Sequence, residues 1–339
     1  MTRGICPVCC STVPATVVDD GNLVWIDKVC PDHGPHRGLM ETSKFHQWVR
    51  TQFDAPAFRA RRACTFINVT DRCDLACPNC YHVPDRDSRD PSRDAVVALA
   101  MRGTTPLVAL LGAEPTLRDD LPELVADIGA ATGKPVVLFT HGLRLANPDY
   151  TGRLADAGLF KVAVGLNLPS YNGEAVFARK RKAIVEIQRH GMLDHVSFSG
   201  VTAANAGDII DTVATLGLAP DELVRVRPAA AVGRHTDGQM YLSQVVDAFA
   251  AAAQTRGLGI SVLPFNNHQY ALMVRIGAQV YILLRWPTME DVDLNELDKG
   301  PSRGLLAPEY GDLHSIHSAM LFIRQRAGLP MPTVEQVRG

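Results

Sequence analysis

Six short apolar runs alternate with segments of helical periodicity between Ala63 and Leu258, and this alternation narrowly limits the available folds. The runs have the length and composition of buried strands. They occupy residues 65–70, 107–112, 135–140, 160–168, 195–201 and 222–228. Strands that alternate with helices form parallel sheets. We therefore expect an α/β fold whose sheet closes into a partial, TIM-like (βα)6 barrel, with an open doubly wound sheet as the alternative.

A loop rich in cysteine, TDRCDLACPNC, directly follows the first of these runs and places Cys73, Cys77 and Cys80 within eight positions. A structural zinc site is closed by four protein ligands, whereas three thiolates can hold three irons of a [4Fe–4S] cluster and leave the fourth iron open. The loop lies at the carboxyl end of a predicted strand, where barrel enzymes place their chemistry. The pattern favours a cluster, and a zinc knuckle completed by His82 is the alternative.

The C-x3-C-x2-C spacing resembles the signature of the radical S-adenosylmethionine (SAM) enzymes. In that family SAM chelates the fourth iron, and an electron from the cluster cleaves it to a 5′-deoxyadenosyl radical. The resemblance extends over about residues 63–230 and implies a radical SAM barrel with a [4Fe–4S] cluster and SAM as cofactors. The family often has an aromatic residue before the third cysteine, but here that position is Asn79 and Tyr81 follows the cysteine.

Further segments at the ends of the predicted strands resemble the SAM-binding motifs of the family. LLGAEPTL is similar to its G-G-E-P segment, which implies that Glu114 accepts a hydrogen bond from the SAM amino group. The small pair Gly112 and Ala113 would allow close backbone approach, and His141 stands where T-N-G motifs have asparagine. The full set implied for SAM is Tyr81, Gly112, Ala113, Glu114, Pro115, His141, Asn167, Ser199 and Arg227. Asn205 is expected near the same rim, and no side chain is identified as catalytic.

The first 45 residues predict a separate metal-binding ribbon. Two short cysteine turns, CPVCC and CPDHG, flank a stretch that predicts a hairpin about Asp20 and Gly21. Pairs of ligands spaced C-x2-C and C-x2-H give tetrahedral geometry from tight turns, so the expected metal is Zn2+ or mononuclear iron. The expected ligands are Cys6, Cys9, Cys30 and His33, with Cys10 as a competing ligand and His36 as a weaker one. This layout resembles the N-terminus of the tetraether lipid synthase-like branch of radical SAM proteins.

The predicted order of domains is a ribbon, a connector, a barrel and a C-terminal segment that caps the substrate. Their expected bounds are 1–45, 46–62, 63–257 and 258–339, with a hairpin at Gly277 and a last helix near 313–327. Residues in the last segment that could meet substrate are Asn266, His268, Arg275, Arg285, Trp286, Asp291, Asp293, His314 and His317. Of these, Arg285 suits an anionic group such as carboxylate or phosphate. Ordinary surface roles are the alternative for each.

Composition and charge limit the partners. A net charge of −2 gives no reason to expect nucleic acid or an anionic membrane as a partner. The basic stretch ARKRK at 178–182 is expected to form a solvated helix face. No cysteine follows Cys80, so we expect no auxiliary cluster. The N-terminus lacks the apolar region of a secretory signal, and no apolar run approaches the ~20 residues of a membrane span, which predicts a cytoplasmic protein without stable membrane insertion.

These observations together predict a radical SAM enzyme that abstracts hydrogen from, or adds to, a small-molecule or lipid-like substrate. A reductase or a flavodoxin- or ferredoxin-type protein would supply the electron. Radical transfer of a methyl or other group is the first alternative. The second, from a different class, is a non-catalytic interaction protein that binds iron–sulfur and zinc centres.

Overall fold

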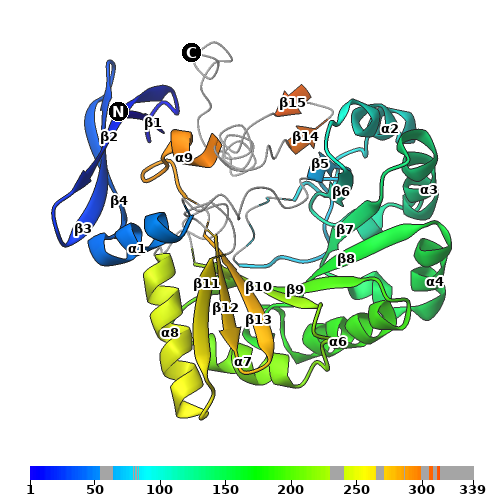
Figure 1. The fold of residues 1–339 in the computed structure, drawn as a ribbon. Helices are drawn as coiled ribbons and strands as arrows, with labels where there is room; N and C mark the ends of the chain where they lie inside the picture. Colours follow the sequence, from blue (N-terminus) through cyan, green and yellow to red (C-terminus); the bar gives the residue numbers. More distant parts are fainter. Residues whose placement is uncertain are drawn as a thin grey trace.

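A computed structural model describes residues 1–53, 64–78, 80, 82, 84–229, 240–264, 271–285, 287–298, 305–307 and 311–313. The described chain contains a four-stranded antiparallel sheet at the N-terminus and an eleven-stranded sheet that carries the helices (Figure 1). Across these residues, no helix combines the length and the apolar composition that crossing a membrane would require.

The N-terminal sheet confirms the predicted hairpin and extends it on both sides. Its strands are β1 (Thr2–Ile5), β2 (Thr12–Asp19), β3 (Leu23–Cys30) and β4 (Gly34–Thr42), and α1 (Ser43–Phe53) follows. In the β2–β3 turn the Asp20 carboxylate accepts hydrogen bonds from the N–H groups of Asn22 and Leu23, while Gly21 has a φ of 90°. The outer strands were not predicted, because β1 has only four residues and β4 begins with Gly-Pro.

All six predicted barrel strands are present and pair in parallel, in sequence order. They are β5 (Cys64–Asn68), β6 (Leu107–Leu111), β7 (Val136–Thr140), β8 (Leu159–Gly165), β9 (Leu193–Val201) and β10 (Leu223–Pro228). The helices are α2 (Arg93–Arg102), α3 (Leu121–Thr132), α4 (Pro148–Asp156), α5 (Pro169–Asn172), α6 (Glu174–Arg189), α7 (Ala206–Ala214) and α8 (Leu242–Thr255). Two 3-10 turns, η2 (Pro115–Leu117) and η3 (Leu143–Ala146), follow β6 and β7. In the described residues the sheet does not close on itself, because β11 and β15 form its two ends.

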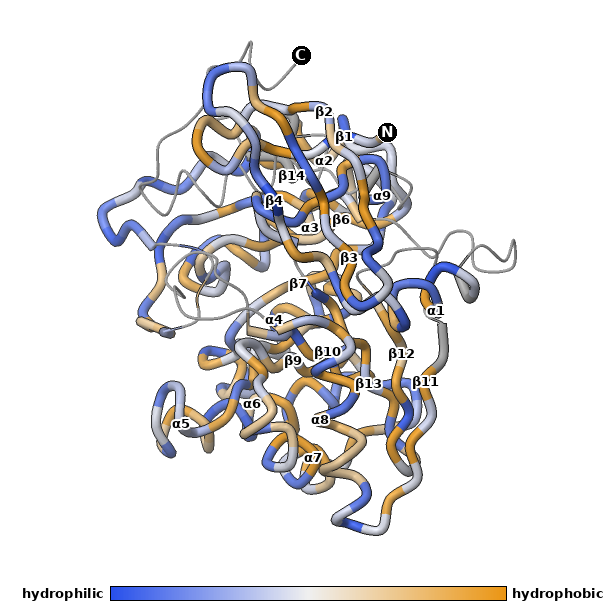
Figure 2. Tube along the Cα trace, turned by 90° about the vertical axis from the view of Figure 1, so that its left-hand side faces the viewer, coloured by the Kyte–Doolittle hydropathy of each residue, from blue (hydrophilic) through white to orange (hydrophobic). Residues whose placement is uncertain are grey.

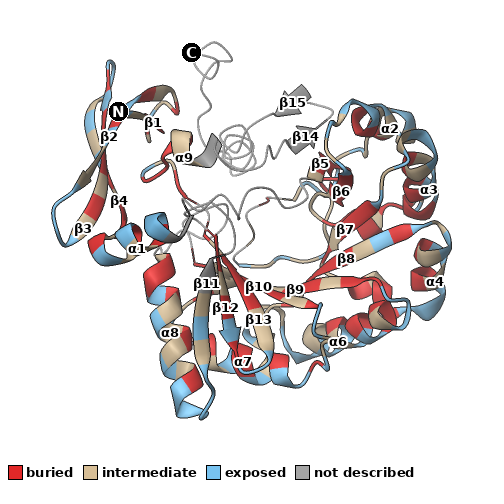
Figure 3. Ribbon diagram, viewed as in Figure 1, coloured by how far each residue is buried: buried red, intermediate tan, exposed pale blue. Residues whose placement is uncertain are grey.

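Successive side chains of each strand point to opposite faces of the sheet. One face is covered by helices, and the other is concave. Val224 and Val226 of β10 belong to the main hydrophobic core, and buried positions in Figure 3 lie along the strands and the helix faces turned toward them. Arg225 and Arg227 therefore point to the concave side. Hydrophobic positions recur along the strands in Figure 2, as the apolar runs predicted.

The C-terminal segment extends the sheet at both ends. The predicted hairpin at Gly277 is confirmed as β12 (Ala271–Ile276) and β13 (Gln279–Leu284), with β11 (Ile260–Pro264) beside β12. β13 pairs in parallel with β10, so its carboxyl end lies on the same rim as those of the barrel strands. β14 (Leu305–Ala307) pairs with β5, and β15 (Gly311–Leu313) pairs with β14. Apart from Leu313, the expected last helix lies outside the described residues.

The ribbon packs against the segment that includes α9 (Leu294–Asp298). Lys28 of β3 is buried, and its Nζ donates to the backbone oxygens of Met289 (2.8 Å) and Glu290 (2.6 Å). A Cβ at Gly38 would lie 1.9 Å from the oxygen of Glu290, so only glycine allows this approach. The ribbon is thereby fixed to the chain that continues from β13.

Candidate functional site

The cysteine loop starts at the carboxyl end of β5, and buried polar contacts fix both of its ends. Asp71 and His82 are almost completely buried, and His82 Nε2 lies 3.2 Å from Asp71 Oδ1. Asn68 Nδ2 donates to the same carboxylate oxygen at 2.9 Å. His82 therefore lies against Asp71, so that the two ends of the cysteine loop meet in the interior of the protein.

Cys73, Cys77 and Cys80 supply the kind of donor atom that an iron–sulfur cluster requires. All three cysteines are partly exposed on one loop. Thiolate is the usual ligand of [4Fe–4S] clusters. The donor set therefore fits three irons of such a cluster, with no fourth cysteine in the barrel loop.

A side chain far away in the sequence contacts one of these sulfur atoms. Asn172 Nδ2, at the end of α5, lies 3.2 Å from Cys77 Sγ. Cys73 Sγ accepts instead from a backbone N–H, that of Leu75, at 3.4 Å. Sequence analysis missed Asn172, because ninety-five positions separate it from Cys77 and no motif marks it.

Glu114 lies at the end of β6 and is fully buried, with both carboxylate oxygens engaged. Oε1 accepts from the backbone N–H of Thr116 (3.0 Å) and from the hydroxyls of Thr116 (2.5 Å) and Thr140 (2.6 Å). Oε2 accepts from the backbone N–H of His141 (2.8 Å) and lies 3.3 Å from that residue's Nε2. Oε2 therefore faces the backbone and the imidazole of His141, whereas Oε1 faces the two threonines.

His141 connects Glu114 to the cysteine loop. Its Nε2 lies 2.7 Å from Oδ1 of Asp74, the residue after Cys73. Burial lowers the pKa of His141, but the carboxylates of Glu114 and Asp74 outweigh this effect and raise it to about 10. Cys73, Asp74 and His141 place their ligand atoms within 4.8 Å of one another. The predicted site residues at the ends of β5, β6 and β7 thus come together.

The small residues Gly112 and Ala113 serve the protein's own packing. A Cβ at Gly112, whose φ is 154°, would lie 2.2 Å from the oxygen of Thr70. The backbone N–H of Ala113 donates to that oxygen at 2.9 Å, and Glu114 N–H donates to the oxygen of Arg72 at 2.9 Å. The segment therefore continues the β5–β6 ladder into the cysteine loop and fixes the loop to Glu114. Pro115 is buried and begins η2.

The remaining predicted SAM positions line the rim at β8, β9 and β10. Asn167 has a φ of 52°, and its Oδ1 accepts from the backbone N–H of Ser199 at 2.8 Å. Ser199 in turn pairs with Arg227 in the β9–β10 register. Asn205 Oδ1 accepts from Thr202 N–H at 2.9 Å, which closes the turn before α7, but its side chain makes no capping hydrogen bond to the helix. Tyr81, Trp286, His314 and His317 lie outside the described residues.

The expectation of a solvated ARKRK face is wrong at one position. Lys180, within the supposedly solvated ARKRK stretch, is buried, and its Nζ donates to the backbone oxygens of Gly165 (2.7 Å) and Leu166 (3.3 Å). Burial lowers the pKa of Lys180, while the nearby thiol of Cys77 and the Glu114 carboxylate act in the opposite direction. Periodicity alone did not reveal this position, because it faces the end of β8 and not the apolar core.

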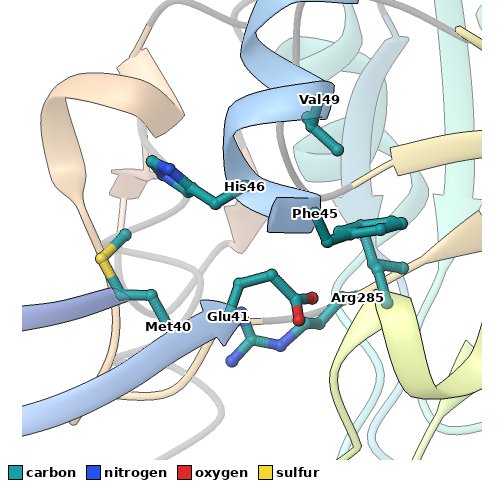
Figure 4. A pocket seen from close by; sticks show the side chains of 7 residues that line it. Met40, Glu41, Phe45, His46, Val49 and Arg285 are labelled. Carbon is teal, nitrogen blue, oxygen red and sulfur yellow. The ribbon is translucent and has the colours of Figure 1, made fainter. Parts of the chain in front are cut away.

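Arg285 has the chemistry to meet an anionic substrate group, but it is buried and contacts a carboxylate of the protein itself. Its guanidinium contacts the Asp291 carboxylate and lies 4.9 Å from the ring centroid of Tyr241. It also lines a small pocket together with Glu41 (Figure 4). The Glu41 carboxylate accepts from the hydroxyl and backbone N–H of Ser243, so this cluster joins the ribbon to the barrel.

The predicted ribbon ligands converge on one point. The Sγ atoms of Cys9 and Cys30 lie 3.8 Å apart, and His33 Nδ1 lies 3.4 Å from Cys30 Sγ and 3.9 Å from Cys6 Sγ. Zn–S bonds of about 2.3 Å in a tetrahedron separate two sulfur atoms by about 3.8 Å. These four ligand atoms, all within 4.8 Å of one another, therefore fit a single Zn2+ or iron ion.

The electrostatics of Cys9 also suit a metal, whereas burial raises the pKa of Cys6. Burial raises the pKa of Cys9, but hydrogen bonds from Ser11 outweigh it and lower the pKa to about 6. Metal binding requires the thiolate form, so this shift favours a bound cation. Cys10 is buried with a φ of 62° and is not part of the four-residue group, whereas His36 Nε2 lies 3.9 Å from Cys6 Sγ.

We expect the ribbon metal to stabilise the fold without taking part in SAM chemistry, because a closed four-ligand site offers no open position. Replacing Cys6 and Cys9 with serine should remove one Zn2+ or iron per chain and lower the thermal unfolding temperature. Elemental analysis and calorimetry measure both, and Cys10→Ser is the matched control that should keep the metal. Loss of SAM cleavage in a well-folded double variant would contradict this view.

Two family models match the chain. One, described as the HMPTM N-terminal zinc ribbon domain, matches residues 1–42, and another, described as the radical SAM superfamily, matches residues 67–187. The first contains both cysteine turns of the ribbon. The second contains the cysteine loop and the strands from β6 to β8, together with most of α6.

Curated proteins and solved structures give further similarities. The chain is 25% identical over 225 residues to 7,8-dihydro-6-hydroxymethylpterin dimethyltransferase of Methanocaldococcus jannaschii, covering 56% of this chain and 44% of that protein. It is 30% identical over 189 residues to GTP 3′,8-cyclase of Erythrobacter litoralis, covering 51% and 50%. The chain therefore spans about half the length of these relatives. Streptococcus suis SuiB bound to its precursor peptide SuiA has a TM-score of 0.53 at 12% identity, covering 82% of this chain and 64% of that one, which shows a shared fold.

Proposed function

We propose that the chain is a radical SAM enzyme, which cleaves SAM reductively to act on a small organic substrate, because residues 67–187 match the model of that superfamily. The observation that carries this proposal is the convergence of Cys73, Asp74, Glu114 and His141 at the ends of three neighbouring strands. Cys73, Cys77 and Cys80 would hold a [4Fe–4S] cluster, and the chemistry that this cluster would supply with SAM is the formation of a 5′-deoxyadenosyl radical.

The chain's own residues would bind and orient SAM at this rim. Glu114 Oε2, held by the backbone N–H of His141, would accept from the SAM ammonium group. The turn at Asn167, fixed to Ser199, would lie along the ribose, and the backbone at Arg227 would border the adenine. Each of these residue roles is proposed from the position of its strand in the sheet.

The concave face favours a substrate with an anionic group and a flat ring system. Arg225 and Arg227 both point to this face from β10, and the Arg225 guanidinium lies 5.8 Å from the ring centroid of Phe139. The ring centroids of Phe66 and Phe139 lie 5.8 Å apart with the ring planes tilted by 59°, so aromatic and cationic groups adjoin. Arginine binds phosphate and carboxylate and also stacks on planar rings. The names of the relatives specify GTP or a dihydropterin, which are fused heterocycles consistent with such a surface.

A second candidate is radical transfer of a methyl group to a pterin-like ring. The observation that favours it is the ribbon, because its family model carries the HMPTM description and a relative that matches over 225 residues is named a pterin dimethyltransferase. In this alternative SAM would also be the methyl donor. A lipid-like substrate has no comparable support from the described residues.

One experiment tests both candidates. The full chain, anaerobically reconstituted and reduced with dithionite, is incubated with SAM carrying a deuterated methyl group, with and without 7,8-dihydro-6-hydroxymethylpterin or GTP. We expect 5′-deoxyadenosine and methionine to form only with reductant, and more rapidly with the true substrate class. A labelled methyl group on the pterin would favour the second candidate. Absence of any SAM-derived product would contradict both and favour a non-catalytic protein.

A further inference from the structure

The geometry around Cys77 points to Asn172 as a residue that tunes the reduction potential of the cluster. We propose that its side-chain N–H donates to the Cys77 thiolate and makes the cluster easier to reduce. The inference rests on the proposed assignment of the cluster to Cys73, Cys77 and Cys80. Asn172 belongs to neither the cysteine loop nor the motifs at the strand ends.

Asn172 contacts the Cys77 sulfur directly, and the chemistry of the two groups determines which of them donates the hydrogen bond. Asn172 Nδ2 lies 3.2 Å from Cys77 Sγ, in a partly buried environment. A thiolate bound to iron has no proton to donate, so the amide nitrogen is the group that must face it. Hydrogen bonds to cluster sulfur atoms are among the features that set the potentials of iron–sulfur proteins.

The turn that carries Asn172 is held in place from three sides. Gly173 N–H donates to the oxygen of Pro169 at 2.7 Å and closes α5 as a single turn. The hydroxyl of Tyr171 donates to the oxygen of Gly200, at the end of β9, at 2.7 Å. Lys180 holds the backbone oxygens just before the turn. The amide of Asn172 is thus oriented before any cluster binds, and little entropy is lost in keeping the contact.

The charge on the cluster determines the direction in which Asn172 should shift its midpoint potential. Reduction adds one electron to the cluster and increases the negative charge on its sulfur ligands. A donated hydrogen bond to a charged sulfur strengthens as that charge grows, so it stabilises the reduced state more than the oxidised state. Removing the donor should therefore lower the midpoint potential. The buried ammonium of Lys180, close enough to respond to the charge of Cys77, acts in the same direction.

The test is a potentiometric titration of the full chain monitored by the EPR signal of the reduced cluster. In Asn172→Leu, which keeps the size but removes the donor, the ratio of reduced to oxidised cluster at a fixed potential should fall about tenfold, or about 59 mV for one electron. In Asn172→Asp, which places a carboxylate beside the thiolate, the ratio of reduced to oxidised cluster should fall by at least the same factor. Ser170 is an exposed residue on the same turn, so Ser170→Ala should have the midpoint potential of the wild type.

Iron and sulfide analysis distinguishes a variant that has lost the cluster from one that keeps the cluster with a changed potential. Full iron content with a wild-type potential in Asn172→Leu would overturn the proposal. If Asn172→Leu loses iron, the isosteric Asn172→Asp decides: a retained cluster with a lowered potential supports tuning, and a lost cluster makes Asn172 an assembly residue, which overturns it. A wild-type chain without a four-iron signal would instead contradict the proposed function itself.

Discussion

Replacing Cys73, Cys77 and Cys80 together with alanine is expected to remove about four irons per chain and to abolish SAM cleavage. The three side chains are partly exposed on a loop whose ends are fixed by other residues, among them the buried pair Asp71 and His82. The loop should therefore keep its position, and the barrel should stay folded without the cluster. Iron and sulfide analysis, the EPR signal of the reduced protein and a 5′-deoxyadenosine assay measure the three consequences.

Cys64 offers a matched control, because it is the remaining cysteine of the barrel and lies at the start of β5, at the opposite end of that strand from the loop. Cys64→Ala should keep the iron and the cleavage activity. Circular dichroism on both variants shows whether the barrel stays folded. A triple variant that still shows the four-iron signal would mean that other residues hold the cluster.

The parts of the fold that were predicted depend on local patterns. The apolar runs of β5 to β10 and the helices between them confirm that alternation predicts a parallel sheet. The spacing within the two cysteine turns of the ribbon likewise predicts four residues whose ligand atoms the structure brings within 4.8 Å of one another. The pairing of β13 with β10 could not be predicted in this way, because a hairpin run does not indicate which strand lies beside it.

The candidate site was predicted where its residues end a strand, and missed where it depends on contacts between distant elements. Glu114 follows β6 in a motif, so its place on the rim could be inferred. Lys180 and Asn172 have no motif, and only folding brings them to the end of β8 and to Cys77. The guanidinium of Arg285 could bind an anionic substrate group, but in the structure it contacts the carboxylate of Asp291, six residues further along the chain. Charged side chains are assigned poorly from sequence because a buried partner changes their role.

Glu114→Gln is expected to weaken SAM binding by about one to two orders of magnitude and to destabilise the fold as well. A charge-assisted hydrogen bond to the SAM ammonium is worth roughly 1.5–3 kcal/mol, which corresponds to that range of affinity. The glutamine oxygen can replace Oε1 for Thr116 and Thr140, but its amide nitrogen would then face the backbone N–H of His141. Leaving that buried donor unsatisfied should cost about 1–3 kcal/mol of unfolding free energy.

The two effects are measured separately, by titrating SAM against the EPR signal of the reduced cluster and by chemical denaturation of the same protein. Glu123→Gln is the matched control, because Glu123 lies on α3 with its side chain about half exposed, 3.3 Å from Arg153. That exposed pair should contribute little, so both readouts should stay near wild type. The cluster should persist in both variants, since none of its ligands changes. Unchanged SAM affinity in Glu114→Gln would remove the end of β6 from the binding site, and with it the assignment of the neighbouring strand ends to SAM.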